Sequence, residues 1–302
     1  MAPIETVAII GRGALGIMYA DAIAQAGGDP VFIMGNARYE RQADEPVQVN
    51  GRECAFRCVR LSEAAPVDLV IFAVKATVLD DAIDLATPLV GPQTRLLSLL
   101  NGITSEERIA ARYGWENLVL AVAQGMDAVR FGNELTYSQM GQIRFGAAPA
   151  TNLEAVFSLA DYLGRMGVPF VLEDDIVHRL WAKFMLNVGV NQTCMVYGGT
   201  YGTVSAPGEQ NRTFVAAMRE VVAVANAEGV ALTEADLTGM AELMATLDPA
   251  GMPSMAQDRI SRKPSEVEEF SGALIARAER HNILVPTNRW LYEQVKRIEG
   301  EY

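Results

Sequence analysis

The stretch Thr6-Val-Ala-Ile-Ile-Gly-Arg-Gly-Ala-Leu-Gly16 decides the fold of this chain. Its first five residues form an apolar, β-branched run, which predicts a buried strand. The glycines that follow match the pattern G-x-G-x-x-G, and the segment 14–26 reads as a helix. In this setting the first glycine permits a tight turn, the second lets a pyrophosphate approach, and the third lets the helix pack on the strand. We therefore predict a dinucleotide-binding loop, with a Gly-rich turn that binds nothing as the alternative. Its residues are Gly11, Arg12, Gly13, Ala14, Leu15 and Gly16.

Strand and helix patterns continue to alternate on the carboxyl side of this loop. The run 69–74 is apolar on both faces, as expected for a strand in the middle of a parallel sheet. Asn50-Gly51 predicts a tight hairpin, because both residues tolerate positive φ. Capping boxes at Thr104-Ser-Glu-Glu107 and Thr151-Asn-Leu-Glu154 predict two helix starts. Further strands are expected over 31–34, 96–100, 118–123 and 168–172.

The texture of the sequence changes after residue 174, where strand-like alternation gives way to long helical periodicities. Helices are expected over 176–190, 212–228, 234–246 and 266–281. We predict an α/β protein with an N-terminal Rossmann-type doubly wound sheet over 1–174 and an all-helical C-terminal domain over 175–302. The apolar helix faces around 214–222 could form the domain core or the surface of a homodimer.

Composition and charge exclude several classes of protein. The 302 residues carry a formal net charge of −12, which disfavours nucleic acid and anionic membranes as partners. Three cysteines and two histidines are too few, and too scattered, for a disulfide framework or a zinc site, so no metal is expected. No secretion signal precedes the first strand, and no apolar run in the first half is long enough to span a bilayer. We expect a cytoplasmic protein.

The end of the second predicted strand indicates which cofactor the loop binds. An acid at this position usually holds the ribose 2′-hydroxyl of NAD, whereas NADP-binding versions replace it and supply an arginine. Here the strand ends in Met34-Gly-Asn-Ala-Arg38, without an acid. We predict NADP(H), bound by Asn36, Arg38 and Arg12, with Arg41 as a further candidate. The alternative is that the helical arginines are solvated charges.

A polar stripe interrupts an otherwise apolar helix in the second half. Lys183, Asn187 and Asn191 are spaced at i, i+4 and i+8, which places them on roughly one helix face. Unpaired burial of such groups costs several kcal/mol, so they must meet water in a cleft or find polar partners. A desolvated lysine gives up its proton more readily, and asparagine amides can hold a carboxylate or hydroxyl. We predict a catalytic site, with a polar packing seam as the alternative.

Four more residues lie at the ends of predicted elements. Lys75 and Asn101 follow two neighbouring strands, at the sheet edge where open α/β folds bind ligands. Ser254 and Glu266 lie near helix starts, where N-capping is the ordinary explanation.

Together these segments resemble the ketopantoate reductase (2-dehydropantoate 2-reductase) family over essentially the whole chain. The resemblance rests on the glycine loop, the Val-Lys75 strand end, Leu100-Asn-Gly102, the stripe of Lys183, and Ser254-Met-x-Gln-Asp258 with Glu266. It implies NADPH-dependent reduction of ketopantoate to pantoate, on the route to pantothenate and coenzyme A.

The resemblance also implies roles for single residues. Lys183 would be the general acid and Glu266 its partner or that of the substrate hydroxyl. The substrate would be held by Asn187, Asn191, Ser254 and Asn101, and Lys75 and Asn101 would line the nicotinamide. The sequence departs from the family pattern in Gln192-Thr-Cys-Met195, at Tyr201 and at Asn36. Alternatives are reduction of another 2-keto acid, a β-hydroxyacid dehydrogenase, and a non-catalytic NADP(H)-binding regulator.

Overall fold

The computed structural model describes residues 3–148 and 150–302, and it divides into two compact units. The sheet unit runs to Leu100 and resumes over Ser105–Ile176. The helical unit comprises Asn101–Thr104 and Val177–Tyr302. The short loop Asn101–Thr104 therefore packs with the helices, although it follows a strand of the sheet.

The sheet unit has a Rossmann-type fold, built on an eight-stranded sheet in the order β12-β11-β8-β7-β6-β1-β2-β5. All neighbouring strands from β8 to β5 are parallel, and β11 is antiparallel to β8. The strands are β1 (Val7–Ile10), β2 (Pro30–Met34), β5 (Cys58–Arg60), β6 (Leu69–Phe72), β7 (Arg95–Ser98), β8 (Leu118–Met126), β11 (Met140–Gly146) and β12 (Phe170–Leu172). The chain reverses its direction of progress across the sheet between β1 and β6, which is the point where such sheets bind ligands.

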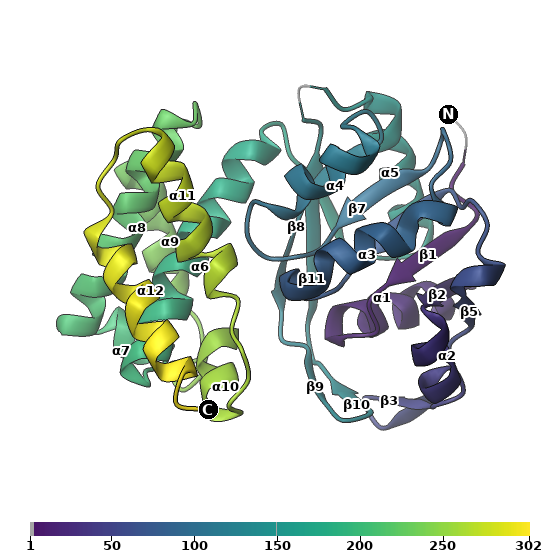
Figure 1. Ribbon diagram of the computed structural model, residues 1–302, viewed down its shortest axis with the longest axis horizontal. Coiled ribbons are helices and arrows are strands. Elements are labelled where there is room, and N and C mark those ends of the chain that lie inside the picture. Colours follow the sequence, from purple (N-terminus) through teal and green to yellow (C-terminus); the bar gives the residue numbers. More distant parts are fainter. Residues whose placement is uncertain (1–2, 149) are drawn as a thin grey trace. The chain divides into compact units, whose positions relative to one another are not determined.

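Helices cover both faces of this sheet, because successive strand residues point to opposite sides. Ile9 and Ile71 pack with α1 and α5, whereas Ile10 and Phe72 pack with α3 and α4. Figure 1 shows α3 and α4 together on one side of the strands. The helices are α1 (Ala14–Gln25), α2 (Asn36–Gln42), α3 (Leu79–Ala86), α4 (Ser105–Tyr113) and α5 (Leu153–Arg165), with short 3₁₀ turns η1 (Leu61–Glu63), η2 (Ala76–Val78) and η3 (Thr87–Leu89).

A second, four-stranded sheet in the order β4-β3-β10-β9 belongs to the same unit. Its strands are β3 (Val47–Val49), β4 (Arg52–Cys54), β9 (Val129–Phe131) and β10 (Glu134–Thr136). The turn between β3 and β4 has φ of 49° at Asn50 and 76° at Gly51, which confirms the predicted hairpin. The sheet buries Val47, Val49 and Leu135 in the core shared with α1.

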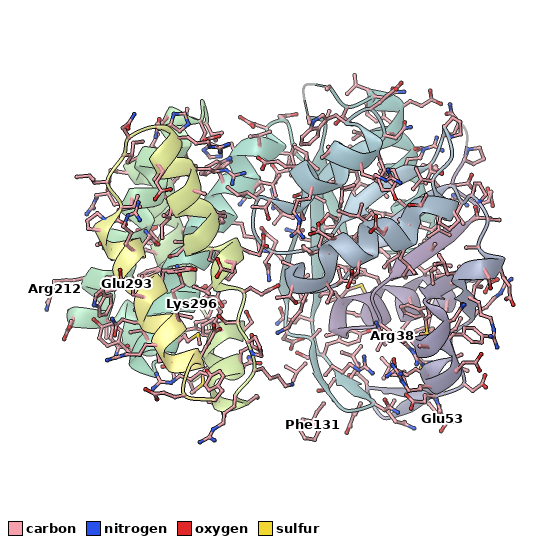
Figure 2. All side chains as sticks on the ribbon, in the orientation of Figure 1. Arg38, Glu53, Phe131, Arg212, Glu293 and Lys296 are labelled. Carbon is pink, nitrogen blue, oxygen red and sulfur yellow. The ribbon has the colours of Figure 1, made fainter. Side chains whose placement is uncertain are left out.

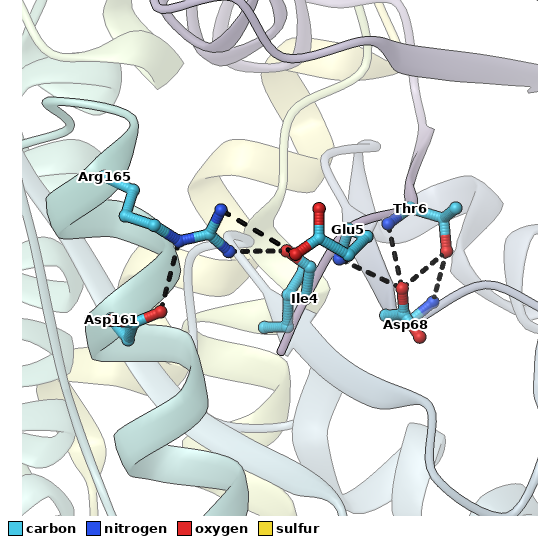
Figure 3. Close-up of polar contacts among 6 residues, drawn as sticks. All are labelled: Ile4, Glu5, Thr6, Asp68, Asp161 and Arg165. Atoms are coloured by element: carbon cyan, nitrogen blue, oxygen red, sulfur yellow. Dashed lines mark hydrogen bonds and ion pairs between the residues drawn. The ribbon is translucent and has the colours of Figure 1, made fainter. Parts of the chain in front are cut away.

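A carboxylate ties the start of β1 to the start of β6 (Figure 3). Asp68 Oδ2 accepts hydrogen bonds from the amides of Glu5 (3.0 Å) and Thr6 (2.9 Å) and from the Thr6 hydroxyl (2.8 Å). Burial alone would raise the pKa of Asp68, but these bonds stabilise the charged form and the pKa lies below its usual value. On the other side of the β1 start, Arg165 bonds to the carbonyl of Ile4 and to Asp161.

The helical unit contains no strand in its described residues, as predicted. Its long helix α6 packs closely on α8, since a Cβ on Gly189 would come within 2.8 Å of Phe214 and 2.7 Å of Met218. Phe214 and Met218 are buried, so this apolar face is core. The elements are α6 (Ile176–Tyr197), α7 (Tyr201–Ser205), α8 (Glu209–Ala227), α9 (Glu234–Ala245), α10 (Ser254–Ile260), η4 (Val267–Glu269), α11 (Ser271–Arg280) and α12 (Pro286–Glu299). None of the helices in the described ranges is long and apolar enough to cross a membrane.

Two local predictions were wrong. The N-cap of α5 is Asn152, whose side chain accepts from the Glu154 amide, because the Thr151 hydroxyl is used elsewhere, donating to the carbonyl of Leu118. The helix expected over 266–281 is broken at the buried Phe270, whose φ of −103° and ψ of −94° are not helical. The 3₁₀ turn η4 therefore precedes a shorter α11.

Candidate active site

The glycine loop follows β1 directly, and two of its glycines are needed by the fold. Gly11 has a φ of +115°, and a Cβ there would lie 2.3 Å from the carbonyl oxygen of Ala73, at the end of β6. A Cβ on Gly16 would lie 2.0 Å from the carbonyl oxygen of Gly11. Gly13 differs, because the nearest atom to its Cβ beyond the adjoining residues would be the carbonyl oxygen of Ala73, 3.7 Å away. The space at Gly13 is therefore available to a ligand, as a pyrophosphate cradle requires.

The first turn of α1 also suits an anion. In the described residues, helix α1 has Gly13 as its N-cap. No side chain caps the helix with a hydrogen bond, and its first turn contains no acidic residue. Its amides and the positive end of the helix dipole are thus left for a ligand. Ala14 and Leu15 begin this helix, and Lys75 is exposed just beyond β6, the strand beside β1. These residues fit a dinucleotide at the reversal point of the sheet.

The predicted phosphate-binding residues lie after β2 and in the glycine loop. Asn36, Arg38 and Arg41 are exposed on α2, and Arg38 Nε donates to Gln42 at 2.9 Å. Arg12 is 4% exposed, and it donates from Nη1 to the carbonyl of Gln42 at 2.6 Å and from Nη2 to the carbonyl of Glu45. Arg12 and Arg38 thus both donate to Gln42, one to its backbone carbonyl and the other to its side chain, so their guanidinium groups lie in one neighbourhood.

In the helical unit, α6 presents the polar stripe on the side away from α8. At about 100° per residue, Gly189 lies roughly opposite Asn187, so the helix packs on α8 with its other face. The Lys183 Nζ donates to Asn101 Oδ1 at 2.9 Å. Lys183 and Asn187 are half-buried, and Asn187 has no side-chain hydrogen bond within the described ranges. The stripe therefore keeps polar groups available beside an apolar helix core.

Asn191 lies one turn further along α6 and is 5% exposed. Its Oδ1 accepts from the Ser254 hydroxyl at 3.1 Å and from the Met255 amide at 3.3 Å, at the start of α10. The structure thus brings together Asn191 and Ser254, which are 63 residues apart. Glu266 is half-buried immediately before η4.

The Asn101–Thr104 loop is held on the helical unit by contacts that the sequence did not reveal. The Thr104 hydroxyl donates to Glu269 Oε2, and Arg277 Nη2 donates to the carbonyl of Ile103 at 3.5 Å. The buried Arg277 guanidinium also lies 6.0 Å from the centre of the Trp181 ring. These contacts position Asn101 for its bond to Lys183.

Local patterns had suggested other roles for these residues. Thr104 matches a capping box, and Glu269 and Arg277 fall within what looks like one continuous helix. Arg277 and Trp181 lie on different helices, and a contact of this kind produces no periodic pattern in the sequence. Only the tertiary structure identifies these contacts.

The cysteine thiols are poor nucleophiles, because burial raises the pKa of Cys54 and Cys58, and raises that of Cys194 to about 12. Across residues 3–148 and 150–302, no group of three or more His, Cys, Asp or Glu side chains could hold a metal ion. The arrangement offers instead a nucleotide cradle in one unit and a lysine with carboxamides in the other.

Comparison with known proteins agrees with this arrangement. The family profile described as "Ketopantoate reductase PanE/ApbA" matches residues 7–150, and its C-terminal counterpart matches residues 175–299. The chain belongs to the ketopantoate reductase family. Relatives named 2-dehydropantoate 2-reductase include one from Vibrio cholerae, 26% identical over 299 residues and 98% of both chains. Another, from Streptococcus pyogenes serotype M3, is 25% identical over 296 residues and 96% of both chains.

Solved structures share the fold over nearly the full length. A 2-dehydropantoate 2-reductase from Geobacter metallireducens superposes with a TM-score of 0.85 at 26% identity, covering 97% of this chain and 99% of its own. A D-mandelate dehydrogenase with NADH and anilino(oxo)acetate gives 0.88 at 24% identity, covering 98% and 99%. This ketopantoate reductase family member is accordingly an oxidoreductase by relationship, and its fold is that of the family.

Proposed function

We propose that this member of the ketopantoate reductase family reduces a 2-keto acid to the 2-hydroxy acid with NADPH, and that ketopantoate is its substrate. The observation that carries the proposal is the 2.9 Å hydrogen bond from Lys183 Nζ to Asn101 Oδ1. It fixes an ammonium group next to a loop that continues directly from Leu100, at the carboxyl side of β7. Lysine, asparagine and serine side chains on one helix face and the start of α10 then supply the polar groups that a keto acid needs.

When bound, the nicotinamide supplies hydride to the carbonyl carbon of the substrate. Negative charge then builds on the carbonyl oxygen, and the Lys183 ammonium stabilises this charge and donates its proton to that oxygen. Asn101 holds the ammonium in place through its Oδ1. Glu266 pairs with Lys183 or with the product hydroxyl, and the proton lost by Lys183 is replaced from solvent.

The carboxamides and one hydroxyl hold the substrate without adding charge. The Asn187 amide and the Ser254 hydroxyl bind the substrate carboxylate and hydroxyl groups. Asn191 orients Ser254 through the bond at 3.1 Å and offers its own amide nitrogen to the substrate. A neutral polar lining of this kind leaves Lys183 as the charge that meets the developing alkoxide.

NADPH rather than NADH is supported by the residues after β2. The strand leads into Gly35 and Asn36 where NAD-binding folds place an acid for the ribose 2′-hydroxyl. Arg12 and Arg38 both bond to Gln42, at the end of the helix that starts at Asn36, and we propose that they meet a 2′-phosphate. Lys75 and Asn101 line the nicotinamide end in this proposal.

The test is a set of initial rates of NADPH oxidation with ketopantoate, other aliphatic 2-keto acids and aryl 2-keto acids, repeated with NADH. We expect turnover with 2-keto acids and a kcat/KM at least about 10-fold higher with NADPH than with NADH, because a 2′-phosphate makes charge-assisted hydrogen bonds. Absence of keto acid reduction, together with oxidation of 3-hydroxy acids in the reverse assay, would identify a β-hydroxyacid dehydrogenase instead. Tight NADPH binding without turnover on any acid would identify a regulator.

A second candidate is reduction of a different 2-keto acid. It is favoured by the residues after Asn191, where Gln192-Thr-Cys-Met195 continues α6, and by Tyr201 at the start of α7. The backbone of Tyr201 is bonded to Gly251, in the loop that leads to α10 and Ser254. A change of side chain here alters the surroundings of Ser254, and the rate panel ranks the acids directly.

We also propose a cytoplasmic location, a homodimer and a domain boundary between residues 174 and 175, two residues before the point where the compact units divide. A Staphylococcus aureus structure of the same fold, at 22% identity, is described as a dimeric ketopantoate reductase. Light scattering coupled to size-exclusion chromatography measures the mass, which is 65 kDa for a dimer, about twice the 32.7 kDa of one chain.

A further inference from the structure

We propose that Arg130, on the hairpin strand β9, is a specificity-determining residue that binds the 2′-phosphate of NADPH together with Arg12 and Arg38. The inference rests on the NADPH-dependent function proposed above. It adds a residue from a different sheet, far along the chain from the glycine loop and from β2.

The pleat of β9 turns Arg130 inward. Val129 and Phe131 on either side are 51% and 89% exposed, whereas Arg130 is half-buried. Figure 2 shows the Phe131 ring extending away from the hairpin. Arg130 Nη1 donates to the backbone carbonyl of Arg12, and its Nε donates to the carbonyl of Gly132 at 2.9 Å. The side chain therefore lies directly against the glycine loop.

Three cations lie near one another here, and no acid in the described residues forms an ion pair with any of them. Burial, and then the guanidinium groups of Arg12 and Arg38, hold the pKa of Arg130 below its usual value, although Glu45 acts in the opposite direction. Within residues 3–148 and 150–302, none of these three arginines forms an ion pair. Like charges held close together destabilise a site unless an anion joins them.

Other arginines of the same unit do form ion pairs with acids. Arg52 on β4 is paired with Asp21 at 2.5 Å, and Arg60 on β5 is paired with Glu40 at 2.5 Å. Acids are thus close at hand in this part of the fold, and the cluster around Arg130 is the place where they do not engage the guanidinium groups. This contrast points to an external anion as the missing partner.

The remaining hydrogen-bond donors suit a phosphate. In the described part of the chain Arg130 Nη2 donates to no protein atom, and Arg12 Nε is buried without a partner. A guanidinium presents its donors in a planar fork that matches phosphate oxygens, and such charge-assisted bonds are among the stronger ones in proteins. The location beside the glycine loop and α2 is where the adenosine ribose of a dinucleotide lies in this fold class.

The test is isothermal titration of wild type and Arg130→Ala with NADPH, NADH, 2′,5′-ADP and 5′-ADP. The matched control is Arg112→Ala, which removes an exposed arginine from the last turn of α4, in the same unit, that does not act on Arg130. We expect Arg130→Ala to weaken NADPH and 2′,5′-ADP by about 10- to 100-fold, as for a lost bond to a charged group. The affinities for NADH and 5′-ADP, and all affinities of the control, should change by less than about 2-fold.

Equal weakening of NADPH and NADH by Arg130→Ala would overturn the inference, because Arg130 would then only fasten β9 to the glycine loop. Unchanged affinities would overturn it as well. If the alanine variant does not fold, Arg130→Lys keeps the charge but loses the fork, and it should still weaken NADPH selectively.

The two proposals fail in different ways. Wild type that binds NADPH and NADH equally well removes both the cofactor preference and the role of Arg130. Wild type that binds NADPH selectively through Arg130, yet reduces no 2-keto acid, removes the proposed reaction and supports the inference.

Discussion

Alanine substitutions at two glycines of the same loop should have opposite consequences. Gly11→Ala places a Cβ 2.3 Å from the carbonyl oxygen of Ala73, at a φ of +115°. Gly13→Ala places a Cβ no closer than 3.7 Å to any atom beyond the adjoining residues, at φ −88° and ψ −170°, which alanine adopts without strain. The first change therefore perturbs the fold, and the second perturbs only the space above the loop.

The magnitudes follow from these contacts. Gly11→Ala combines an unfavourable backbone conformation with a backbone collision, for a loss of about 2–5 kcal/mol in the free energy of unfolding. For a domain of this size that corresponds to a fall in Tm of roughly 5–15 °C. Gly13→Ala should change the free energy of unfolding by less than about 1 kcal/mol. Its methyl group occupies the place of the pyrophosphate, so NADPH affinity should fall by at least about 10-fold.

Thermal unfolding followed by circular dichroism gives the stability of both variants without ligand. Fluorescence titration with NADPH gives the affinity. A Gly13→Ala protein that is as stable as wild type and binds NADPH equally well would refute the assignment of this loop as the cofactor cradle.

Three further changes test the rest of the structure. Thr104→Val removes the hydrogen bond to Glu269 that holds the Asn101–Thr104 loop. Steady-state kinetics should show kcat lowered about 3- to 10-fold, with NADPH affinity unchanged. An unchanged kcat would mean that the loop keeps its position without this hydrogen bond. Asn191→Ala leaves the Ser254 hydroxyl without its acceptor, so the KM for the keto acid should rise about 10-fold or more. A KM equal to that of wild type would show that Asn191 and Ser254 do not bind the substrate. Asp68→Asn should cost about 1–3 kcal/mol in urea unfolding at pH 7. Because folding lowers the pKa of Asp68, the carboxylate stabilises the protein above about pH 4, and this stabilisation is lost as the pH falls through the folded-state pKa. The free energies of unfolding of wild type and Asp68→Asn should therefore converge in acid. A difference that stays constant with pH would contradict this.

The parts of the fold that could be predicted are those with local signals. Gly11, Gly13 and Gly16 act within one turn, and the reversal at Asn50-Gly51 depends on two adjacent residues with positive φ. Likewise, the stripe of α6 follows from helical spacing alone, and the loss of strand alternation after residue 174 marks the start of the helices.

The parts that could not be predicted depend on contacts between distant residues. Arg130 meets Arg12 across 118 positions, and Thr104 meets Glu269 across 165. Neither contact produces a periodic pattern in the sequence. Local sequence alone places Arg130 in a short strand and Thr104 at a helix cap. The failure at Thr151 has the same origin, since its hydroxyl bonds to the carbonyl of Leu118 in β8.

Catalysis by the Lys183 ammonium is tested most directly by the single-turnover rate of NADPH oxidation with saturating 2-keto acid, in wild type and Lys183→Ala. The account predicts a rate lowered by about two to four orders of magnitude, with NADPH affinity within about 2-fold of wild type. A Lys183→Ala rate within about 3-fold of wild type would show that another group supplies the proton, and would contradict the account.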